Sequence, residues 1–281
     1  MASSATTTNL SDLTLVSCWY SLKNKFNEAT YGRWMSNLLL NVRCFHLIIF
    51  TDASGSEIIN RFINDGNRVF ITVVIKELSD LEGYKLKDYW IENHSRNTLL
   101  KDKISWELNM LWSEKIRFVK SAYDMGLIKT QWSGWCDIGY FRGRGNDIPV
   151  EQIKEWPSLK VINSLEQNKI YYAFVSHPSI LSRLYHFSSR RNKMGLPEIP
   201  IPENQVSIAG GFFILTVDTI QWWYDTYYRL LDLYLMNRYL VKDDQIIVID
   251  CILQYLSHFK LISETERGKY DEWFVFQRYL F

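Results

Sequence analysis

The stretch Gln131-Trp-Ser-Gly-Trp-Cys-Asp-Ile-Gly-Tyr-Phe-Arg142 carries one carboxylate, Asp137, in a run of mostly apolar and aromatic residues. Such a run predicts a buried strand, and the Gly-Arg-Gly at 143–145 predicts a flexible basic loop after it. Ligands of open α/β sheets bind at the carboxyl ends of the strands. A carboxylate there, followed by arginines, suits a divalent cation and a phosphate. A cap or an ion-pair partner is nevertheless the commoner role of a single acid at a strand end.

Outward from this stretch, strand-like and helical patterns alternate along the chain. The long helical pattern at 84–123 has a break near 93–98, and Ser54 with Glu57 predicts a capping box at the start of another helix. Alternation of this kind predicts an α/β domain with a parallel sheet and crossover helices, and the chain shows no internal repeat or low-complexity linker that would divide it. We expect strands at 13–19, 46–52, 68–75, 159–162, 170–175, 206–217 and 259–262, and helices at 31–41, 54–65, 84–123, 179–188, 218–240 and 243–257.

The composition is that of a globular protein, with 47% hydrophobic and 22% charged residues in 281. The 15% of aromatic residues indicates either a large aromatic core or surfaces that stack on sugars or bases. A net charge of +1 gives no electrostatic footprint for nucleic acid, so we expect no nucleic-acid partner.

Residues 1–12 are small and polar, and we expect them to form a disordered tail, without the apolar segment of a secretory signal. No apolar run approaches the roughly 20 residues of a membrane helix. The four cysteines are far apart in the sequence, which favours reduced thiols. These features predict a soluble, cytoplasmic protein without a membrane span.

Three short motifs could carry chemistry, each with a structural alternative. Lys115 follows Glu114 in a helical pattern, where a solvated helix face is commoner than a phosphate site. Gly210-Gly211 interrupts a strand pattern, which indicates either a bulge or the close approach of a ligand. Asp243-Asp244 opens a helix, where one acid serves as N-cap and the other is left as a base or metal ligand.

His177 and His258 are more typical of structural histidines than of ligands. The sequence contains no P-loop, dinucleotide fingerprint, GxSxG or HExxH motif, which excludes the commonest nucleotide-binding and hydrolase chemistries.

Seven motifs follow one another from about residue 13 to the end of the chain. They are Val16-Ser-Cys-Trp-Tyr20, the spacing of Phe26, Tyr31 and Trp34, Ile49-Phe-Thr-Asp52, Trp112 with Lys115, Trp135-Cys-Asp-Ile-Gly-Tyr-Phe-Arg142, Ala209-Gly-Gly-Phe-Phe213 and Lys242-Asp-Asp-Gln245. This ordered set resembles the HtrL/YibB-type family of glycosyltransferases. The resemblance implies a GT-A-like fold: a Rossmann-type mixed sheet flanked by helices in a single domain, 13–281, with a nucleotide half at about 13–142 and an acceptor half at about 143–281.

The resemblance further implies a nucleotide-sugar donor of the UDP type, carrying xylose, galactose or glucose, and a glycan acceptor. Mn²⁺ or Mg²⁺ would be held by Asp137, the last acid of an Asp-x-Asp motif whose first position is Trp135 here. This departure leaves the need for metal open, and His258 is a further candidate ligand. The residues expected to bind the donor are Ser17, Trp19, Tyr20 and Asp52 for the nucleoside, Lys115 and Arg142 for the phosphates, and Gly210 and Gly211 for close approach of the sugar.

The resemblance implies that Asp244 or Asp243 is the general base of an inverting displacement at the acceptor hydroxyl. Two other functions fit the same residues. One is a carbohydrate-binding protein that has the fold without the activity. The other is a metal-dependent phosphohydrolase with Asp137, Asp243 and Asp244 as ligands.

Overall fold

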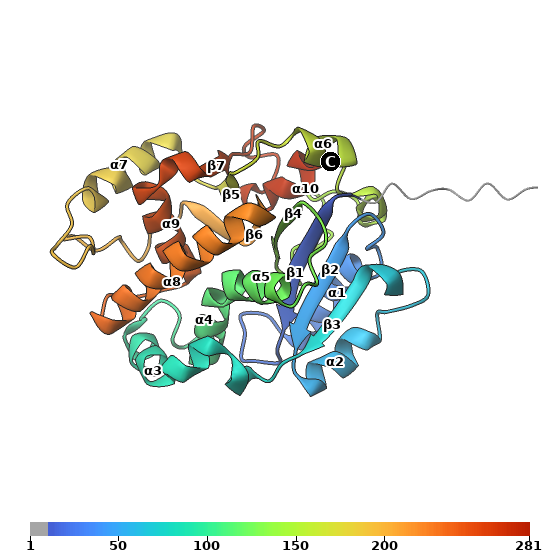
Figure 1. Cartoon of the computed structure of the whole chain (residues 1–281), viewed down its shortest axis with the longest axis horizontal. Coiled ribbons are helices and arrows are strands. Elements are labelled where there is room, and N and C mark those ends of the chain that lie inside the picture. The colour runs from blue at the N-terminus through green and yellow to red at the C-terminus, as the bar shows by residue number, and fades with distance from the viewer. Residues whose placement is uncertain (1–10) are drawn as a thin grey trace, which may run out of the picture.

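The computed structural model describes residues 11–281, which form a seven-stranded mixed sheet with helices on both faces (Figure 1). The strand order is β3-β2-β1-β4-β6-β5-β7. The strands are β1 (Leu13–Trp19), β2 (His46–Thr51), β3 (Ile71–Ile75), β4 (Trp132–Cys136), β5 (Ile170–Phe174), β6 (Ile208–Thr216) and β7 (Phe259–Ile262).

The sheet has a parallel part and a part organised around one antiparallel strand. Strands β1 to β4 run parallel, as the alternating pattern predicts. Strand β6 runs antiparallel to both of its neighbours, β4 and β5, whereas β5 and β7 are parallel. The start of β6 therefore lies at the same edge of the sheet as the end of β4, which brings two distant parts of the chain together.

Helices connect the strands and cover the sheet. In Figure 1, α5, α8 and α9 lie on the opposite face of the sheet from α1 and α2. The helices are α1 (Glu28–Leu39), α2 (Ala53–Asn60), α3 (Lys87–Arg96), α4 (Trp106–Ser113), α5 (Lys115–Asp124), α6 (Leu159–Ser164), α7 (Pro178–Ser188), α8 (Ile220–Met236), α9 (Asp244–Gln254) and α10 (Val275–Tyr279).

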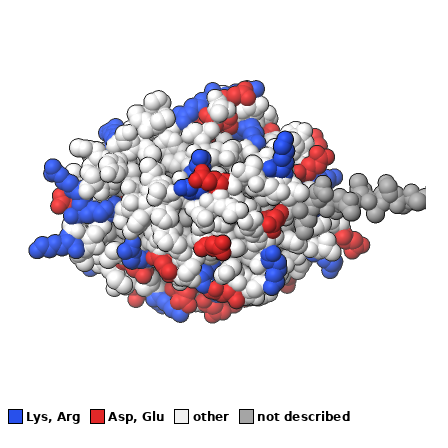
Figure 2. All heavy atoms as spheres, turned by 45° about the horizontal axis from the view of Figure 1, so that its top comes forward, with Lys and Arg blue, Asp and Glu red and all other residues white. Residues whose placement is uncertain are grey.

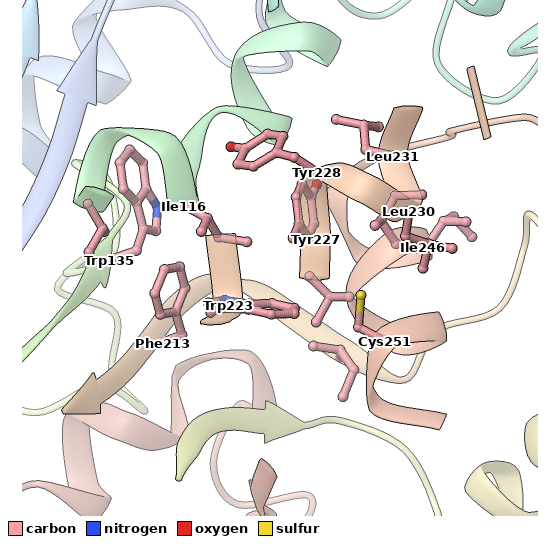
Figure 3. Close-up of a cluster of buried hydrophobic side chains, with 14 of the residues drawn as sticks. Ile116, Trp135, Phe213, Trp223, Tyr227, Tyr228, Leu230, Leu231, Ile246 and Cys251 are labelled. Atoms are coloured by element: carbon pink, nitrogen blue, oxygen red, sulfur yellow. The ribbon is translucent and has the colours of Figure 1, made fainter. Parts of the chain in front are cut away.

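Strand β1 shows why both faces are covered. Its side chains alternate between two buried clusters, with Leu15 and Trp19 in the cluster under α1 and α2 and Val16 in the cluster under α5, α8 and α9. A strand that buries both faces belongs in the interior of a parallel sheet. The cluster under α5, α8 and α9 joins Trp135 of β4 and Phe213 of β6 to aromatic residues of α8 (Figure 3).

Most predicted elements are confirmed to within a few residues, including the strands at 13–19 and 259–262, and four differ. Asp52, not Ser54, caps α2 by accepting a hydrogen bond from Gly55 N at 2.6 Å, and that helix ends at Asn60. The segment at 68–70 is a 3₁₀ turn before β3, and the predicted strand at 159–162 is helix α6. The break predicted near 93–98 in the long helical segment lies at 97–105, and a second break, at Glu114, was not predicted.

The predicted disordered tail is wrong at its end. Ser11 donates to Cys44 O from both its backbone N and its hydroxyl, each at 2.6 Å. Asp12 accepts a hydrogen bond from Gln131 N at 2.8 Å. These bonds continue the sheet one step before β1, and residues 1–10 lie outside the described part of the chain.

The surface carries mixed charge, and Figure 2 shows Lys and Arg side chains interspersed with Asp and Glu on one face. Among residues 11–281, no helix has the length and apolar character to cross a membrane.

Candidate functional site

A cleft lies at the carboxyl ends of β1 and β4. These strands are neighbours, but the connection after β1 leads to β2 on one side, whereas the chain reaches β4 on the other side after β3. Such a reversal of strand order is where open α/β sheets bind ligands. The cleft has two adjoining hollows, of about 600 and about 770 Å³, which share Tyr31, Trp112, Lys115, Asp137 and Arg142 among their walls.

The two hollows differ in their lining. The first, called here the aromatic lobe, has one carboxylate, Asp137, and six rings in its wall: Trp19, Tyr20, Tyr31, Trp34, Trp112 and Trp135. The second, called here the carboxylate lobe, has three carboxylates, Asp137, Asp243 and Asp244, and also six rings: Phe26, Tyr31, Trp112, Tyr140, Trp273 and Phe274. A cleft with flat rings in both lobes and carboxylates gathered in one of them is suited to a ligand that is aromatic at one end and polar at the other.

Lys115 lies between the two candidate acids. Its Nζ donates to Gly210 O at 2.7 Å and lies 3.1 Å from Asp244 Oδ2 and 3.3 Å from Asp137 Oδ1. An ammonium group has three donors, so these three oxygens use all of them. Burial by itself lowers the pKa of Lys115, but the two carboxylates outweigh it, and the pKa lies above its usual value. Lys115 is therefore a charged, saturated internal cation.

Asp137 is held on one side and open on the other. The indole N–H of Trp135 donates to its Oδ1 at 2.6 Å, the same oxygen that Lys115 contacts. Residues two apart in a strand face the same way, which places Trp135 and Asp137 together. The backbone N–H of Asp137 donates to Gly211 O at 2.8 Å. Its side chain is 43% exposed, compared with 8% for Lys115 and Asp244, so Asp137 is the more accessible of the two acids in contact with Lys115.

The two glycines lie in a bulge that leaves room for these acids. The pairing of β5 with β6 passes from Tyr172–Phe213 directly to Ala173–Ala209, so residues 210–212 leave the ladder. A Cβ on Gly210 would lie 2.6 Å from Asp244 Oδ2, and one on Gly211 would lie 3.3 Å from Asp137 Oδ2. The predicted bulge is therefore confirmed, and the groups that approach the two glycines are carboxylates of the protein itself; the close approach of a ligand stays a prediction.

Asp243 and Asp244 begin α9 in different environments. Asp243 has the extended backbone of an N-cap but no capping side-chain bond, and its Oδ2 pairs with Lys242 at 3.1 Å. Its Oδ1 is buried with no hydrogen-bond partner. Burial raises the pKa of Asp244 to about 6, with Lys115 opposing the rise and the other two carboxylates adding to it. Asp244 thus changes charge near neutral pH.

Three buried asparagines fix the residues that lead into this acidic pair. Asn93 accepts from Val241 N at 2.9 Å and donates to Val241 O at 2.8 Å. Asn109 also donates to Val241 O, and Asn97 donates to Lys242 O at 2.9 Å. Because α3, the residue after it (Asn97) and α4 supply these amides, the long insertion between β3 and β4 positions the start of α9.

Arg142 is a cation without an acidic partner. Its guanidinium lies 4.4 Å from the ring centre of Trp34 and 4.8 Å from that of Phe274. Among residues 11–281 it makes no ion pair, and its Nε is buried without a partner, whereas Arg144 pairs with Asp147 and Asp271. Burial, with Arg144 nearby, lowers the pKa of Arg142.

Lys25 is a second such cation. Its Nζ lies 4.9 Å from the ring centre of Trp112, and within the described chain it has no carboxylate within ion-pair distance. Both Lys25 and Arg142 line the carboxylate lobe and are available to an anion.

The structure brings together most of the predicted site. The predicted residues that line the cleft are Trp19, Tyr20, Lys115, Asp137, Arg142, Gly210, Gly211, Asp243 and Asp244.

Three predicted residues lie elsewhere. Ser17 is fully buried in the sheet, and Asp52 caps α2. His258 stacks on Trp222 with ring centres 4.1 Å apart, just before β7, and does not line the cleft with Asp137. Across residues 11–281, no three His, Cys, Asp or Glu side chains form a group that could hold a metal ion.

Sequence reasoning missed much of the aromatic lobe and one cation. Tyr31, Trp34 and Trp112 appear in the motifs that carry the resemblance but were given no role in binding, and Lys25 was not considered. Trp135 was treated as the loss of an acid, whereas its indole holds Asp137. The signal available in the sequence was its position two residues before Asp137 in a predicted strand.

No protein-family model and no curated protein matches this chain. Among solved structures, one similar to it is the galactosyltransferase LgtC in complex with donor and acceptor sugar analogues. That protein is 8% identical, and the match covers 93% of this chain and 83% of LgtC with a TM-score of 0.46. A likeness at this level assigns no family and no activity to the chain.

Proposed function

We propose that the protein is a glycosyltransferase that moves a sugar from a nucleotide-sugar donor to a hydroxyl of a glycan. The observation that carries this proposal is the two-lobed cleft at the reversal of strand order, with rings in both lobes and the carboxylates gathered in one of them. A nucleotide sugar fits this arrangement, because its flat base can stack on rings and its sugar hydroxyl groups can donate hydrogen bonds to carboxylates.

In the proposed arrangement the base lies in the aromatic lobe, near Trp19 and Tyr20, and the sugar lies in the carboxylate lobe. The diphosphate between them would be bound by Arg142 and Lys25, the two cations that lack acidic partners. Lys115 is not assigned to phosphate binding, because all three of its donors are used within the protein. The motifs that resemble the HtrL/YibB-type family favour a UDP-linked hexose or pentose.

The reaction requires one bond to form and one to break at the anomeric carbon. The acceptor hydroxyl oxygen attacks this carbon, the bond to the diphosphate oxygen breaks, and the bonding electron pair leaves with the nucleoside diphosphate. Asp244 would take the proton of the hydroxyl, and the result is inversion at the anomeric carbon. A base works best when its pKa is close to the working pH, and the raised pKa of Asp244 meets this condition.

The test is donor turnover with and without acceptor. Purified protein is incubated with a panel of UDP-sugars and glycan acceptors, and the release of UDP and of free phosphate is measured. Acceptor-dependent release of UDP, lost in Asp244→Asn and retained in the exposed control Asp225→Asn, would support the transferase.

The other outcomes correspond to the two alternative functions. Release of inorganic phosphate without an acceptor would indicate a phosphohydrolase. Binding of glycan without any turnover or nucleotide binding would indicate a carbohydrate-binding protein. Either result would refute the proposed transfer reaction.

A further inference from the structure

The resemblance to the HtrL/YibB-type family implies Mn²⁺ or Mg²⁺ at Asp137, and the residues around this acid can be compared with what such an ion needs. Mg²⁺ takes six oxygen ligands in an octahedron at about 2.0–2.1 Å, and part of this set must come from protein oxygens. Three oxygens converge in the cleft: Asp137 Oδ1, Asp244 Oδ2 and Gly210 O. Nζ of Lys115 lies at the point where they converge, so the residues present do not fit a resident metal ion.

Lys115 is fixed in this position. It is the first residue of α5, directly after the break at Glu114, and its side chain is 8% exposed. Its ammonium also lies 6.0 Å from the ring centre of Trp135, whose indole N–H holds the same Oδ1 of Asp137. Withdrawing the ammonium would leave Asp244 as a buried carboxylate without a cation and next to a second carboxylate, Asp137, which is strongly unfavourable.

The balance of charges in the cleft also argues against a need for a metal ion. Three carboxylates and three cations line the two lobes, and Asp243 is already paired with Lys242, outside the lining. With Lys115 shared between Asp137 and Asp244, Arg142 and Lys25 remain without acidic partners. The cleft can therefore receive a diphosphate without a dication to offset acidic side chains.

We propose that Lys115 is a built-in cation at the position a divalent ion would otherwise take, and that the protein binds its nucleotide donor without metal. This inference rests on the proposed transfer function. In the reaction, the negative charge that develops on the leaving diphosphate would be stabilised by Arg142 and Lys25. The ammonium of Lys115 would keep Asp137 and Asp244 from repelling that charge.

The first experiment uses the wild-type protein. Binding of UDP is measured by isothermal titration calorimetry, once with EDTA and once with Mn²⁺. We expect the two dissociation constants to agree within about twofold, and Mn²⁺ alone to give no binding isotherm. UDP binding that needs Mn²⁺ would overturn the built-in cation but leave the transferase. No UDP binding in either buffer would overturn the transferase itself, so the two failures are distinguishable.

The second experiment empties the position of the ammonium. Lys115→Ala leaves Asp137, Asp244 and Gly210 O around a vacant point, and we expect the variant to give a binding isotherm with Mn²⁺ alone, where wild type gives none. Lys242→Ala is the matched control, because it frees only Asp243 and should gain no Mn²⁺ binding. A Lys115→Ala protein with native circular dichroism that gains no Mn²⁺ binding would contradict the inference. Should this variant not fold, the calorimetry on wild type still decides.

Discussion

Two of the three cations that line the cleft, Lys115 and Arg142, lie in opposite environments. Lys115 is buried and in contact with three oxygens, whereas Arg142 is stacked on Trp34 and Phe274 and has no carboxylate partner. A charge that is fully paired stabilises the fold around it, and a charge held by ring faces alone remains available to a ligand. Both residues were predicted to bind phosphates, so the comparison shows that sequence position does not distinguish a cation used in internal contacts from one that has no acidic partner.

The largest effect should come from breaking the paired cation. Lys115→Met removes the ammonium and leaves Asp137 and Asp244 without compensation, which should lower the free energy of unfolding by about 3–5 kcal/mol. Urea unfolding at pH 8 measures this loss. The double variant Lys115→Met/Asp244→Asn should recover part of it, since only Asp137 then remains charged. Independent, additive losses would show that the two side chains do not interact.

Substitution of Arg142, the cation without an acidic partner, should affect ligand binding more than stability. Arg142→Met should weaken the binding of UDP by about 1.5–3 kcal/mol, the usual contribution of a hydrogen bond to a charged group, and change stability little. Arg144→Met is the matched control two residues away, because it breaks ion pairs with Asp147 and Asp271 and should change stability rather than UDP affinity. Calorimetry with UDP, together with urea unfolding, separates the two effects. Equal losses of UDP affinity in both variants would refute the distinction.

The two carboxylates that contact Lys115 can also be perturbed by adding a Cβ atom to the neighbouring glycines. Gly210→Ala places a Cβ 2.6 Å from Asp244 Oδ2, so the acid must move, and we expect a loss of about 1–3 kcal/mol in the free energy of unfolding. Gly211→Ala places a Cβ 3.3 Å from Asp137 Oδ2, on the more exposed acid, and should cost less. Thermal or urea unfolding of both variants tests the order. A larger loss for Gly211→Ala would show that Asp137, not Asp244, is the tightly confined acid.

The parallel sheet could be predicted because it depends on local patterns. Strand β1 matches its predicted limits, since a short run of residues that favour strands marks a strand with two buried faces. The contacts of Lys115 could not be predicted, because they depend on β6 running antiparallel beside β4 and on a bulge at 210–212. The sequence pattern around a lysine does not indicate which distant carbonyl and carboxylate groups its ammonium contacts in the folded chain.

The errors in the predicted site have the same origin. Asp52, like Asp137, directly follows a strand. The chain after Asp52 turns at once into α2, and its side chain caps that helix. His258 follows α9 and stacks on Trp222, near the sheet edge formed by β7. Asp137 instead lies where the strand order reverses, which decides whether an acid at a strand end faces a cleft.

The last and smallest effect concerns the proton of Asp244. With its pKa near 6, Asp244 is a carboxylate at pH 7.5 and largely protonated at pH 5, so a base at this position should lose activity as the pH falls. Below pH 6 the value of kcat/KM for sugar transfer should fall by about tenfold per pH unit, which is about 1.4 kcal/mol. The pH–rate profile of the wild-type protein measures this limb.

The pH–rate profile also tests the different effects of Lys115 and Arg142 on the pKa of Asp244. Lys115 opposes the rise in the pKa of Asp244, so a folded Lys115→Met variant should show the acid limb at higher pH than wild type. Arg142→Met should lower the rate without moving the limb, because Arg142 does not contact Asp244. Asp243→Asn also removes a carboxylate that raises the pKa of Asp244, so it should move the limb to lower pH. A limb that disappears in Asp243→Asn would instead assign the base to Asp243, whose Oδ1 is the buried oxygen without a partner.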